Sequence, residues 1–309
     1  MSRITSSIMM VRPANFGYNH ETAQNNAFQS EDLASTAQEI REKALMEFDL
    51  MVTKLRQTGI EVLVFKDTPI PIKPDAIFPN NWISFHEDGS VITYPMWSNI
   101  RRKERREDII TALGSTFKVK AYLHLEHEEQ KEKYLEGTGS MVFDREARIA
   151  YACVSPRTHP DLFFEFCERF GYTPILFEAV DSQQQLIYHT NVMMAIGEST
   201  AVVCLESIAG SKDRTRVVET LDQKGLRIVE ISQAQMQAFA GNMLQLQAKT
   251  GIKYMVMSEQ AYLALDSNQI RALEKDATCF YLPIYTIEKS GGGSVRCMMA
   301  EIFLPRLSA

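Results

Sequence analysis

Short apolar runs and polar turns alternate along most of the chain. A typical unit begins with an apolar run at residues 81–85, turns at 87–90 and returns in a second apolar run at 91–94. Apolar residues at helical spacing follow, and then another short apolar run. This pattern predicts a β-hairpin, a helix and a third strand, in that order.

The hairpin pattern recurs along the chain at a nearly constant period. The first residues of the successive units are Asn81, Ser140, Asn191, Asn242 and Cys297, so neighbouring units begin 51 to 59 residues apart. A period near fifty residues is typical of folds in which each repeat is one supersecondary unit. We therefore predict an α/β fold in which five ββαβ units close into a pseudo-symmetric five-bladed propeller with a central channel. The alternative is an open α/β sheet, which is less natural because hairpins, not single strands, separate the helices.

The same patterns place the remaining elements. Helices are predicted at residues 31–58, 101–113, 160–170, 211–224, 232–240 and 266–275. Further strands are predicted at 4–12, 60–65, 117–123, 173–178, 226–231 and 278–285. The polar stretch 13–30 is interpreted as a loop, and no stretch resembles a linker, so residues 1–309 are expected to form a single domain.

Composition restricts the class of protein. The chain has 309 residues, of which 45% are apolar and 23% charged, as is typical of a soluble protein with a large core. A net charge of -6 argues against nucleic acid as a partner. No apolar run approaches the roughly 20 residues that span a bilayer, so no membrane partner is expected. The basic run 101–106 is interrupted by Glu104 and is interpreted as a solvated helix face.

The cysteines and histidines indicate neither disulfides nor a metal. The five cysteines are odd in number and none has C-x-x-C spacing. Because the N-terminus also lacks a secretory signal pattern, a reducing cytoplasm is the expected compartment. The six histidines include no H-E-x-x-H motif, so neither a metal nor another cofactor is expected.

One cysteine stands apart because three glycines, residues 291–293, closely precede it. The sequence predicts a flexible loop that delivers the thiol of Cys297 to the entrance of a buried strand. Taken alone, a buried structural cysteine is the more frequent explanation. Core positions are predicted for the other cysteines, and surface or loop positions for every histidine except His189. The former are Cys153, Cys167, Cys204 and Cys279, and the latter are His20, His86, His124, His127 and His159.

Closure of the ring would gather chemically active residues at one end of the axis. Asp75, Glu136 and His189 lie just before the first three units, whereas residues 240–241, before the fourth, are small and chemically silent. Cys297 itself begins the fifth. A thiol, an imidazole and a carboxylate can act as nucleophile, acid/base catalyst and orienting group. Each residue alone also has a structural explanation, and their shared position in the repeat favours a site.

These segments resemble the guanidine-modifying superfamily, which includes arginine deiminase, dimethylarginine dimethylaminohydrolase and the amidinotransferases. Gly-Gly-Gly-Ser-Val-Arg-Cys at 291–297 resembles the nucleophile loop of arginine deiminase, and Pro-Asp-Ala-Ile-Phe-Pro-Asn-Asn at 74–81 resembles a segment of the dimethylarginine hydrolase. Glu136-Gly is similar to the family's histidine-orienting Glu-Gly, and His189-Thr-Asn to its His-x-Asp. The resemblance implies the five-bladed propeller, called a pentein, with Cys297, His189 and Glu136 as catalytic residues.

The resemblance also implies a small amino acid as the ligand. Segments containing Arg101 and Arg157 are similar to places where arginines bind the substrate's α-carboxylate. A homodimer or a higher homo-oligomer is compatible with the family, and the sequence leaves the oligomeric state open.

Departures from the family pattern bear on the substrate. Relatives acting on a cationic guanidinium have carboxylates where this chain has Asn80, Asn81 and Asn191. An amide offers a donor and an acceptor but no charge, and a buried carboxylate beside a neutral ligand would be uncompensated. We therefore predict that these amides and Asp75 grip a neutral ureido group. Hydrolysis of citrulline to ornithine, ammonia and carbon dioxide is the expected reaction, as in the citrulline hydrolases of this superfamily.

Two kinds of alternative stay open, one enzymatic and one not. If Asp75 alone pairs with a guanidinium, the activity is that of an arginine deiminase, a dimethylarginine hydrolase or an amidinotransferase. The last alternative is not an enzyme: the same fold serves as a ribosome-binding translation factor that lacks the catalytic triad.

Overall fold

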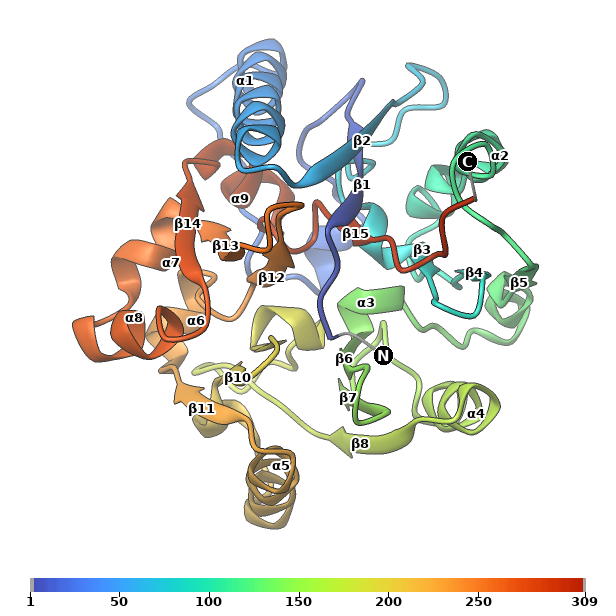
Figure 1. Ribbon diagram of the computed structural model, residues 1–309. Coiled ribbons are helices and arrows are strands. Elements are labelled where there is room, and N and C mark those ends of the chain that lie inside the picture. The colour runs from blue at the N-terminus through green and yellow to red at the C-terminus, as the bar shows by residue number, and fades with distance from the viewer. Residues whose placement is uncertain (1–2, 308–309) are drawn as a thin grey trace.

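A computed structural model describes residues 3–307, and within this range five three-stranded sheets surround a common axis (Figure 1). In four sheets an antiparallel hairpin is extended by a third strand that runs parallel to the hairpin's second strand. The fifth sheet, in the order β15-β1-β2, combines the two ends of the chain. The predicted five-bladed α/β propeller is confirmed.

The strands agree with the predicted repeat. In order around the ring they are β3 (Ile83–Phe85), β4 (Ser90–Thr93) and β5 (Ala121–His124); β6 (Met141–Asp144), β7 (Ile149–Cys153) and β8 (Thr173–Phe177); β9 (Met194–Ile196), β10 (Thr200–Val203) and β11 (Arg227–Glu230); β12 (Leu244–Gln247), β13 (Lys253–Ser258) and β14 (Thr278–Leu282); and β15 (Ala300–Glu301), β1 (Ser7–Arg12) and β2 (Glu61–Lys66).

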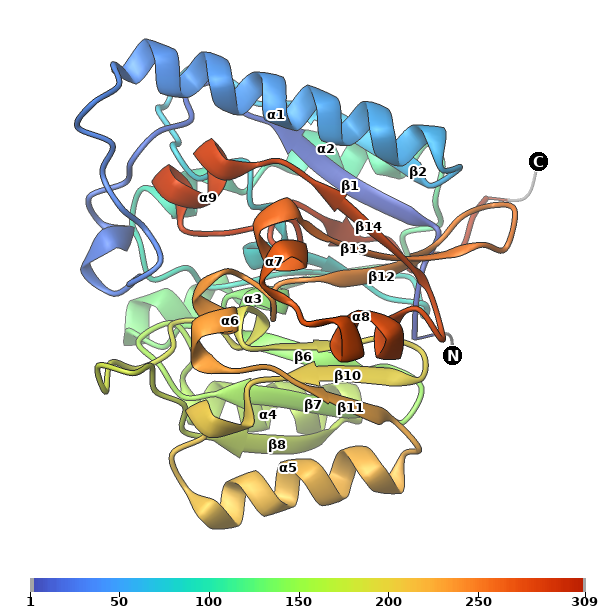
Figure 2. The ribbon, with the colours of Figure 1, turned by 90° about the vertical axis from the view of Figure 1, so that its left-hand side faces the viewer.

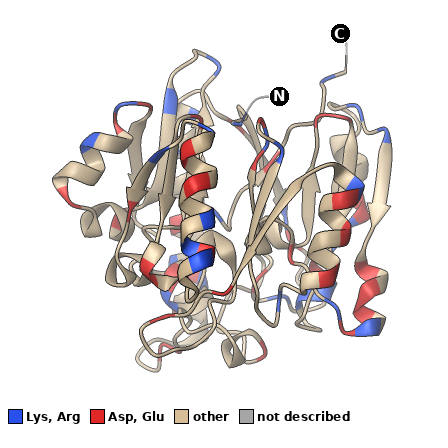
Figure 3. Cartoon of the chain, turned by 90° about the horizontal axis from the view of Figure 1, so that it is seen from below, with Lys and Arg blue, Asp and Glu red and all other residues tan. Residues whose placement is uncertain are grey.

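The longer helices lie outside the ring, each between the second and third strands of a blade (Figure 1). The helices are α1 (Ala37–Gln57), α2 (Glu107–Leu113), α3 (Gly137–Ser140), α4 (Pro160–Phe170), α5 (Ser211–Gln223), α6 (Gln233–Gln237), α7 (Glu259–Ala264), α8 (Ser267–Leu273) and α9 (Tyr285–Gly291). Seen from below, the positions of charged residues are concentrated on several helices, while most of the strands between them carry few (Figure 3). Charge on the outside and apolar strands inside are what a ring of half-buried helices requires. No helix within residues 3–307 is long and apolar enough to cross a membrane.

The structure differs from the sequence prediction beside the glycines. The predicted strand 278–285 ends at Leu282, and the helix α9 then runs to Gly291, which the left-handed Gly292 (φ 63°) terminates. The loop therefore begins later than predicted: Gly291 ends the helix with a glycine-type C-cap, and residues 292–299 form the loop that carries Cys297 to β15. Cys297 lies in a tight turn, because its amide donates to the Ser294 carbonyl at 3.0 Å, and β15 begins only at Ala300.

Predictions for single cysteines and histidines can also be compared with the structure. Cys153, Cys167 and Cys204 are buried as predicted, whereas Cys279 is half-buried. His86 lies in the turn between β3 and β4, in agreement with the predicted surface or loop position, but it is buried there, with 8% of its surface exposed. The reason is a hydrogen bond to Ser84 (Nε2 to Oγ, 2.8 Å) that satisfies one ring nitrogen inside the protein.

Neighbouring blades approach each other most closely where each first strand begins. A Cβ atom placed on Gly241 would lie 2.3 Å from the carbonyl oxygen of Val192 and 2.9 Å from the Cα atom of Met193. Both contacts are with backbone, which cannot move aside like a side chain. The fourth unit can therefore enter the ring only without a side chain at this position.

We expect Gly241→Ala to lower the free energy of unfolding by about 2 kcal/mol or more, because overpacking against fixed backbone is costly. Gly17→Ala is the matched control, since a Cβ atom at Gly17 meets nothing within 4 Å. Urea unfolding of both variants measures the difference. Equal stability of the two variants would show that the blades can separate at no cost.

Candidate active site

The residues that precede the blades meet in one narrow pocket. Its lining comprises Thr22, Asn26, Asp75, Phe78, Asn81, Arg101, Arg157, Tyr188, His189, Gly291, Gly292, Gly293 and Cys297. Side views place this end of the ring near α3 and α9, where the segment between β1 and α1 also passes (Figure 2). The free space is about 10 Å³, close to that of one water molecule, so an amino acid must widen the pocket on entry.

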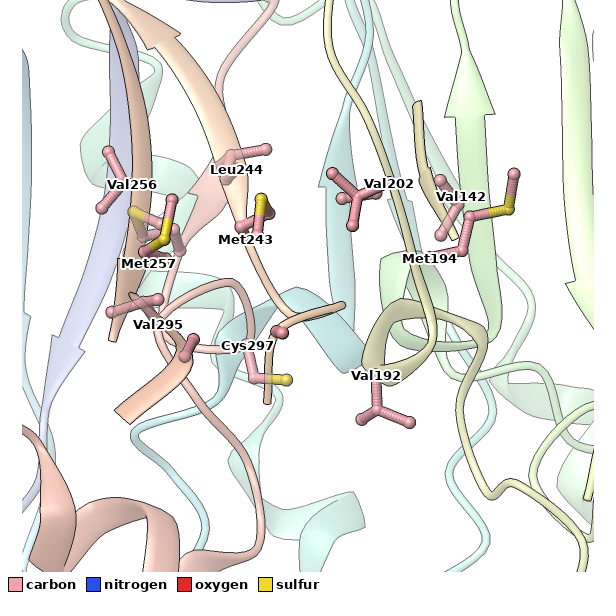
Figure 4. Packing of buried hydrophobic residues seen from close by; sticks show 14 of the residues in the cluster. Val142, Val192, Met194, Val202, Met243, Leu244, Val256, Met257, Val295 and Cys297 are labelled. Atoms are coloured by element: carbon pink, nitrogen blue, oxygen red, sulfur yellow. The ribbon is translucent and has the colours of Figure 1, made fainter. Parts of the chain in front are cut away.

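Two amide side chains donate to the sulfur of Cys297. Asn191 Nδ2 lies 3.4 Å from Sγ and Asn242 Nδ2 lies 3.3 Å from it. The thiol is 3% exposed and lies at the end of the apolar core, with its sulfur directed toward the segment carrying Val192 (Figure 4). N–H donors of this kind stabilise negative charge that develops on the sulfur.

Asn242 is a residue that sequence reasoning missed. The search upstream of the fourth unit found only residues 240–241, which are chemically silent, and gave no role to the unit's first residue, which faces the thiol. Asn242 is held in place by its donation to the Asn191 carbonyl at 2.9 Å and by the Arg296 amide, which donates to its Oδ1 at 3.1 Å. The available signal was its register, since Asn81 and Asn191 begin two other units.

His189 and Glu136 form a buried pair. His189 Nε2 lies 2.8 Å from Glu136 Oε2. Because a carboxylate only accepts, the imidazole proton is on Nε2 and Nδ1 is the basic nitrogen. Burial lowers the pKa of His189 to about 4, although Glu136 opposes this, so the ring is neutral at pH 7. Burial acts to raise the pKa of Glu136, but the charge of Arg157 and the hydrogen bond from His189 together bring it down to about 2.

Arg101 is buried and bound to the protein on several sides. Its Nε donates to Glu104 at 2.9 Å, its Nη1 to Asn81 Oδ1 at 2.8 Å, and its Nη2 to the Phe78 carbonyl at 3.1 Å. The basic run 101–106 was predicted to be a solvated helix face, and this is wrong at Arg101. Arg101–Glu104 form a 3-10 turn in which the side chain of Arg101 is buried. The guanidinium of Arg101 therefore donates mainly to protein acceptors, which leaves fewer of its N–H groups for the carboxylate of a ligand.

Arg157 anchors a segment that covers the pocket. Its Nε and Nη2 donate to Asn25 Oδ1 at 2.9 and 2.6 Å, and its Nη2 also donates to the Thr22 carbonyl at 3.0 Å. The guanidinium lies 4.9 Å from the ring centre of Tyr188. Sequence reasoning gave the loop 13–30 no function, yet it forms the cover. Its only sequence signal was a high content of asparagine.

Asp75 presents one oxygen atom to the pocket. Asn19 Nδ2 donates to Asp75 Oδ2 at 2.7 Å and Thr22 Oγ1 to the same atom at 3.3 Å. Within residues 3–307 the other oxygen, Oδ1, is buried and has no hydrogen-bond partner. Burial raises the pKa of Asp75, and the positive charge of Arg101 opposes that rise. A buried oxygen of this kind is suited to a donor from a ligand.

The three predicted amides are not equivalent. Asn81 lines the pocket, and its Nδ2 has no partner among the described residues. Asn191 is beside the thiol, as given above. Asn80 is buried but is absent from the pocket lining, and neither its Nδ2 nor its Oδ1 is hydrogen bonded within residues 3–307. Contrary to expectation, Asn80 is therefore not placed to grip a ligand in this pocket.

No group of three or more His, Cys, Asp and Glu side chains in the described part of the chain is arranged to hold a metal ion. The chemistry that the pocket can perform therefore rests on a thiol, an imidazole–carboxylate pair, amides and two guanidinium groups. Such a set can attack a carbon atom and move protons to and from nitrogen and oxygen.

A family model described as eukaryotic N,N dimethylarginine dimethylhydrolase matches residues 12–304. No curated protein sequence matches.

Solved structures show the same fold. The N-terminal domain of ArgZ with bound substrate, an arginine dihydrolase from Cyanobacteria, has a TM-score of 0.73 at 16% identity, covering 97% of this chain and 99% of that one. A dimethylarginine dimethylaminohydrolase adduct with S-methyl-L-thiocitrulline has a TM-score of 0.62 at 13% identity, covering 97% and 100%. Apo ArgZ has a TM-score of 0.74 at 15% identity. The match covers 97% of this chain but only 41% of that longer protein.

We expect Asn242→Ala to slow the alkylation of Cys297 by iodoacetamide at pH 7 about fivefold, since one hydrogen bond to the sulfur is worth roughly 1 kcal/mol. Mass spectrometry of the Cys297 peptide measures the rate, and the half-buried Cys279 provides an internal reference. Asn268→Ala, an exposed position on α8, is the control. An unchanged rate in Asn242→Ala would mean that this amide does not activate the thiol.

Proposed function

The chain belongs to the N,N-dimethylarginine dimethylhydrolase family of the guanidine-modifying superfamily, and from this premise we propose that Cys297 attacks the side-chain carbon of citrulline. Like the members of its family, the protein is a hydrolase that acts on C–N bonds. The observation that carries the proposal is the thiol with two amide donors in one pocket with His189, which Glu136 holds at 2.8 Å. The ribosome-binding alternative is set aside because that factor lacks the triad.

The proposed reaction has two halves. Neutral His189 takes the proton of the Cys297 thiol as the sulfur attacks the ureido carbon, and then gives it to the departing amine, so that ornithine leaves. A carbamoyl group is now bonded to sulfur. His189 next removes a proton from water, which attacks that carbon and releases the thiol. The carbamate product breaks down to ammonia and carbon dioxide. Glu136 stabilises the imidazolium that forms in each half.

Two amides support a neutral ureido group as the target. Asn81 Nδ2 lines the pocket without a partner among the described residues, so it can donate to the ureido oxygen. Asn191 is not in the pocket lining, but its Nδ2 donates to the Cys297 sulfur, and its Oδ1 is unpartnered within that range, so it can accept from an N–H group of a ligand at the sulfur. An amide side chain has no charge, so it does not favour a cationic ligand over a neutral one. A carboxylate in its place would be left uncompensated beside a neutral ligand.

Arginine is a second candidate substrate, favoured by Asp75. Its free Oδ1 could pair with a guanidinium, which a buried carboxylate binds strongly. The buried charged groups at the pocket also carry an excess of one negative charge when all are ionised, because Asp75, Glu104 and Glu136 face Arg101 and Arg157. A guanidinium would balance that excess. Attack on arginine would release ammonia and give citrulline, which the reaction above would then consume.

We expect Cys297→Ser to lower the rate of ornithine and ammonia formation from citrulline at least about a thousandfold, since a neutral hydroxyl is a far weaker nucleophile than a thiolate. The matched control is Cys279→Ser, which removes a thiol outside the pocket and should retain activity. Citrulline, arginine and dimethylarginine are assayed separately. Release of ornithine by Cys297→Ser at the wild-type rate would exclude the proposed nucleophile.

Asp75→Asn separates the two candidate substrates. We expect kcat/KM for arginine to fall about a hundredfold or more, because a buried charge pair is lost, whereas that for citrulline should change by less than about tenfold. Asp222→Asn, on the exposed side of α5, is the control. An equal fall for both substrates would show that Asp75 does not read the charge of the ligand.

A further inference from the structure

A second cavity, of about 140 Å³, lies away from the thiol. It is formed by the turn between β3 and β4, the turn between β6 and β7, and the end of α4. Its lining comprises His86, Glu87, Asp88, Arg145, Arg148, Arg169, Phe170 and Tyr172. Cys297 and the other leading residues precede the first strands, so these turns are at the opposite end of the hairpins. In Figure 2 they lie toward the side on which the N-terminus is marked.

Arg145 is a buried cation without an anionic partner in the described chain. Its side chain is 5% exposed, and within residues 3–307 its guanidinium neither donates a hydrogen bond nor pairs with a carboxylate. It lies 4.1 Å from the ring centre of Phe303 and 5.2 Å from that of Phe143. Aromatic contacts offset the loss of hydration only in part.

The other buried arginines show how unusual this is. Arg101 donates to Glu104 and Arg296 donates to Glu301, each through a short hydrogen bond. Arg157 donates to Asn25 and to a backbone carbonyl. Among the buried arginines of the described chain, only Arg145 donates no hydrogen bond to a protein acceptor, and it lines this cavity. A cavity that holds such a cation is suited to an anion.

Two exposed guanidinium groups surround the entrance. Arg148 lies 5.3 Å from the ring centre of Tyr172, and Arg169 lies 5.5 Å from that of Phe170. These rings keep both cations beside the cavity. Arg148 Nη1 has one weak donation, to the Phe170 carbonyl at 3.4 Å, so most of its donors stay available.

The remaining polar groups on the wall form no hydrogen bond or ion pair with Arg145 among the described residues, and three guanidinium groups face two carboxylates, Glu87 and Asp88, at this cavity. Asp88 is engaged at its own turn, where its Oδ1 accepts from the Ser90 amide at 2.8 Å, and Glu87 also has a partner. His86 bonds to Ser84 and its ring is stacked at 6.1 Å on that of Phe170. Burial lowers the pKa of His86 to about 3, so the ring adds no charge at pH 7.

We propose that this cavity binds a small oxyanion, a phosphate or a carboxylate, through bidentate hydrogen bonds from Arg145, with Arg148 and Arg169 at the rim. A planar guanidinium fork matches two oxygens of such a group. The volume is near that of a cavity that holds a benzene ring, which accommodates phosphate or a short carboxylate but no nucleotide or polymer. The site is separate from the pocket of Cys297 and does not depend on the proposed reaction.

Titration calorimetry with inorganic phosphate and with succinate, each at the same ionic strength set by sodium chloride, tests the proposal. Wild-type protein should bind at least one of them, and the tighter of the two identifies the source of the oxyanion. Arg145→Met should weaken that binding about tenfold or more, since a charge-assisted bidentate contact is lost. Arg41→Gln, an exposed arginine on α1, is the control and should bind like the wild type.

A second measurement guards against loss of the fold. The bound anion should raise the melting temperature of the wild type relative to chloride, and Arg145→Met should fold yet show no such rise. If Arg145→Met does not fold, the double variant Arg148→Gln/Arg169→Gln alters exposed side chains only and should weaken binding several-fold. Absence of binding in the wild type overturns the proposal. The proposal is also overturned if Arg145→Met binds the anion as tightly as the wild type. If Arg145→Met is unfolded, wild-type binding by the double variant overturns it instead.

Discussion

Closure of the ring by the strand β1 is the constraint on which the position of the thiol depends. β1 pairs in parallel with β2 and antiparallel with β15, the two-residue strand that follows Cys297. The amide of Ile302 donates to the carbonyl of Ser7 at 2.9 Å, across nearly the whole length of the chain. Such contacts carry a large loop-closure cost and form late. The nucleophile therefore reaches the axis only when both ends of the chain have folded together.

A buried network of charges surrounds the pocket once the ring is closed. Arg101 binds Glu104 directly and lies 3.8 Å from oxygens of both Asp75 and Glu136. Burial raises the pKa of Glu104 to about 7 in spite of Arg101, because the carboxylate is removed from water. Buried ions persist only when their partners are fixed in place. The network thus holds Glu136 against His189 while leaving one oxygen of Asp75 for a ligand.

The sequence predicts the elements and site residues that recur in each repeat, and it predicts few of the segments that occur once. Position in the repeat led to Asp75, Glu136, His189 and Cys297, which the structure brings to one end of the axis. Asp75, His189 and Cys297 line the pocket, and Glu136 lies behind His189. The covering segment has no periodicity, because its backbone is held by side chains from distant blades. The helix α9, Tyr285–Gly291, was not predicted, for a related reason. The carboxylate of Glu47, on α1, accepts from the amides of Thr286 and Ile287 and so caps its start, a contact that no local pattern encodes.

Pseudo-symmetry explains how such a fold can host different chemistries without being rebuilt. Equivalent first positions in neighbouring blades, such as Asn191 and Asn242, converge on one sulfur although 51 residues separate them. The backbone that brings them together is fixed by close packing at Gly241, which contacts no ligand group. Side chains at the first positions can therefore change while the ring stays the same. It follows that the choice between a charged and a neutral substrate rests on a few amides and carboxylates at one register, and not on the architecture that presents them.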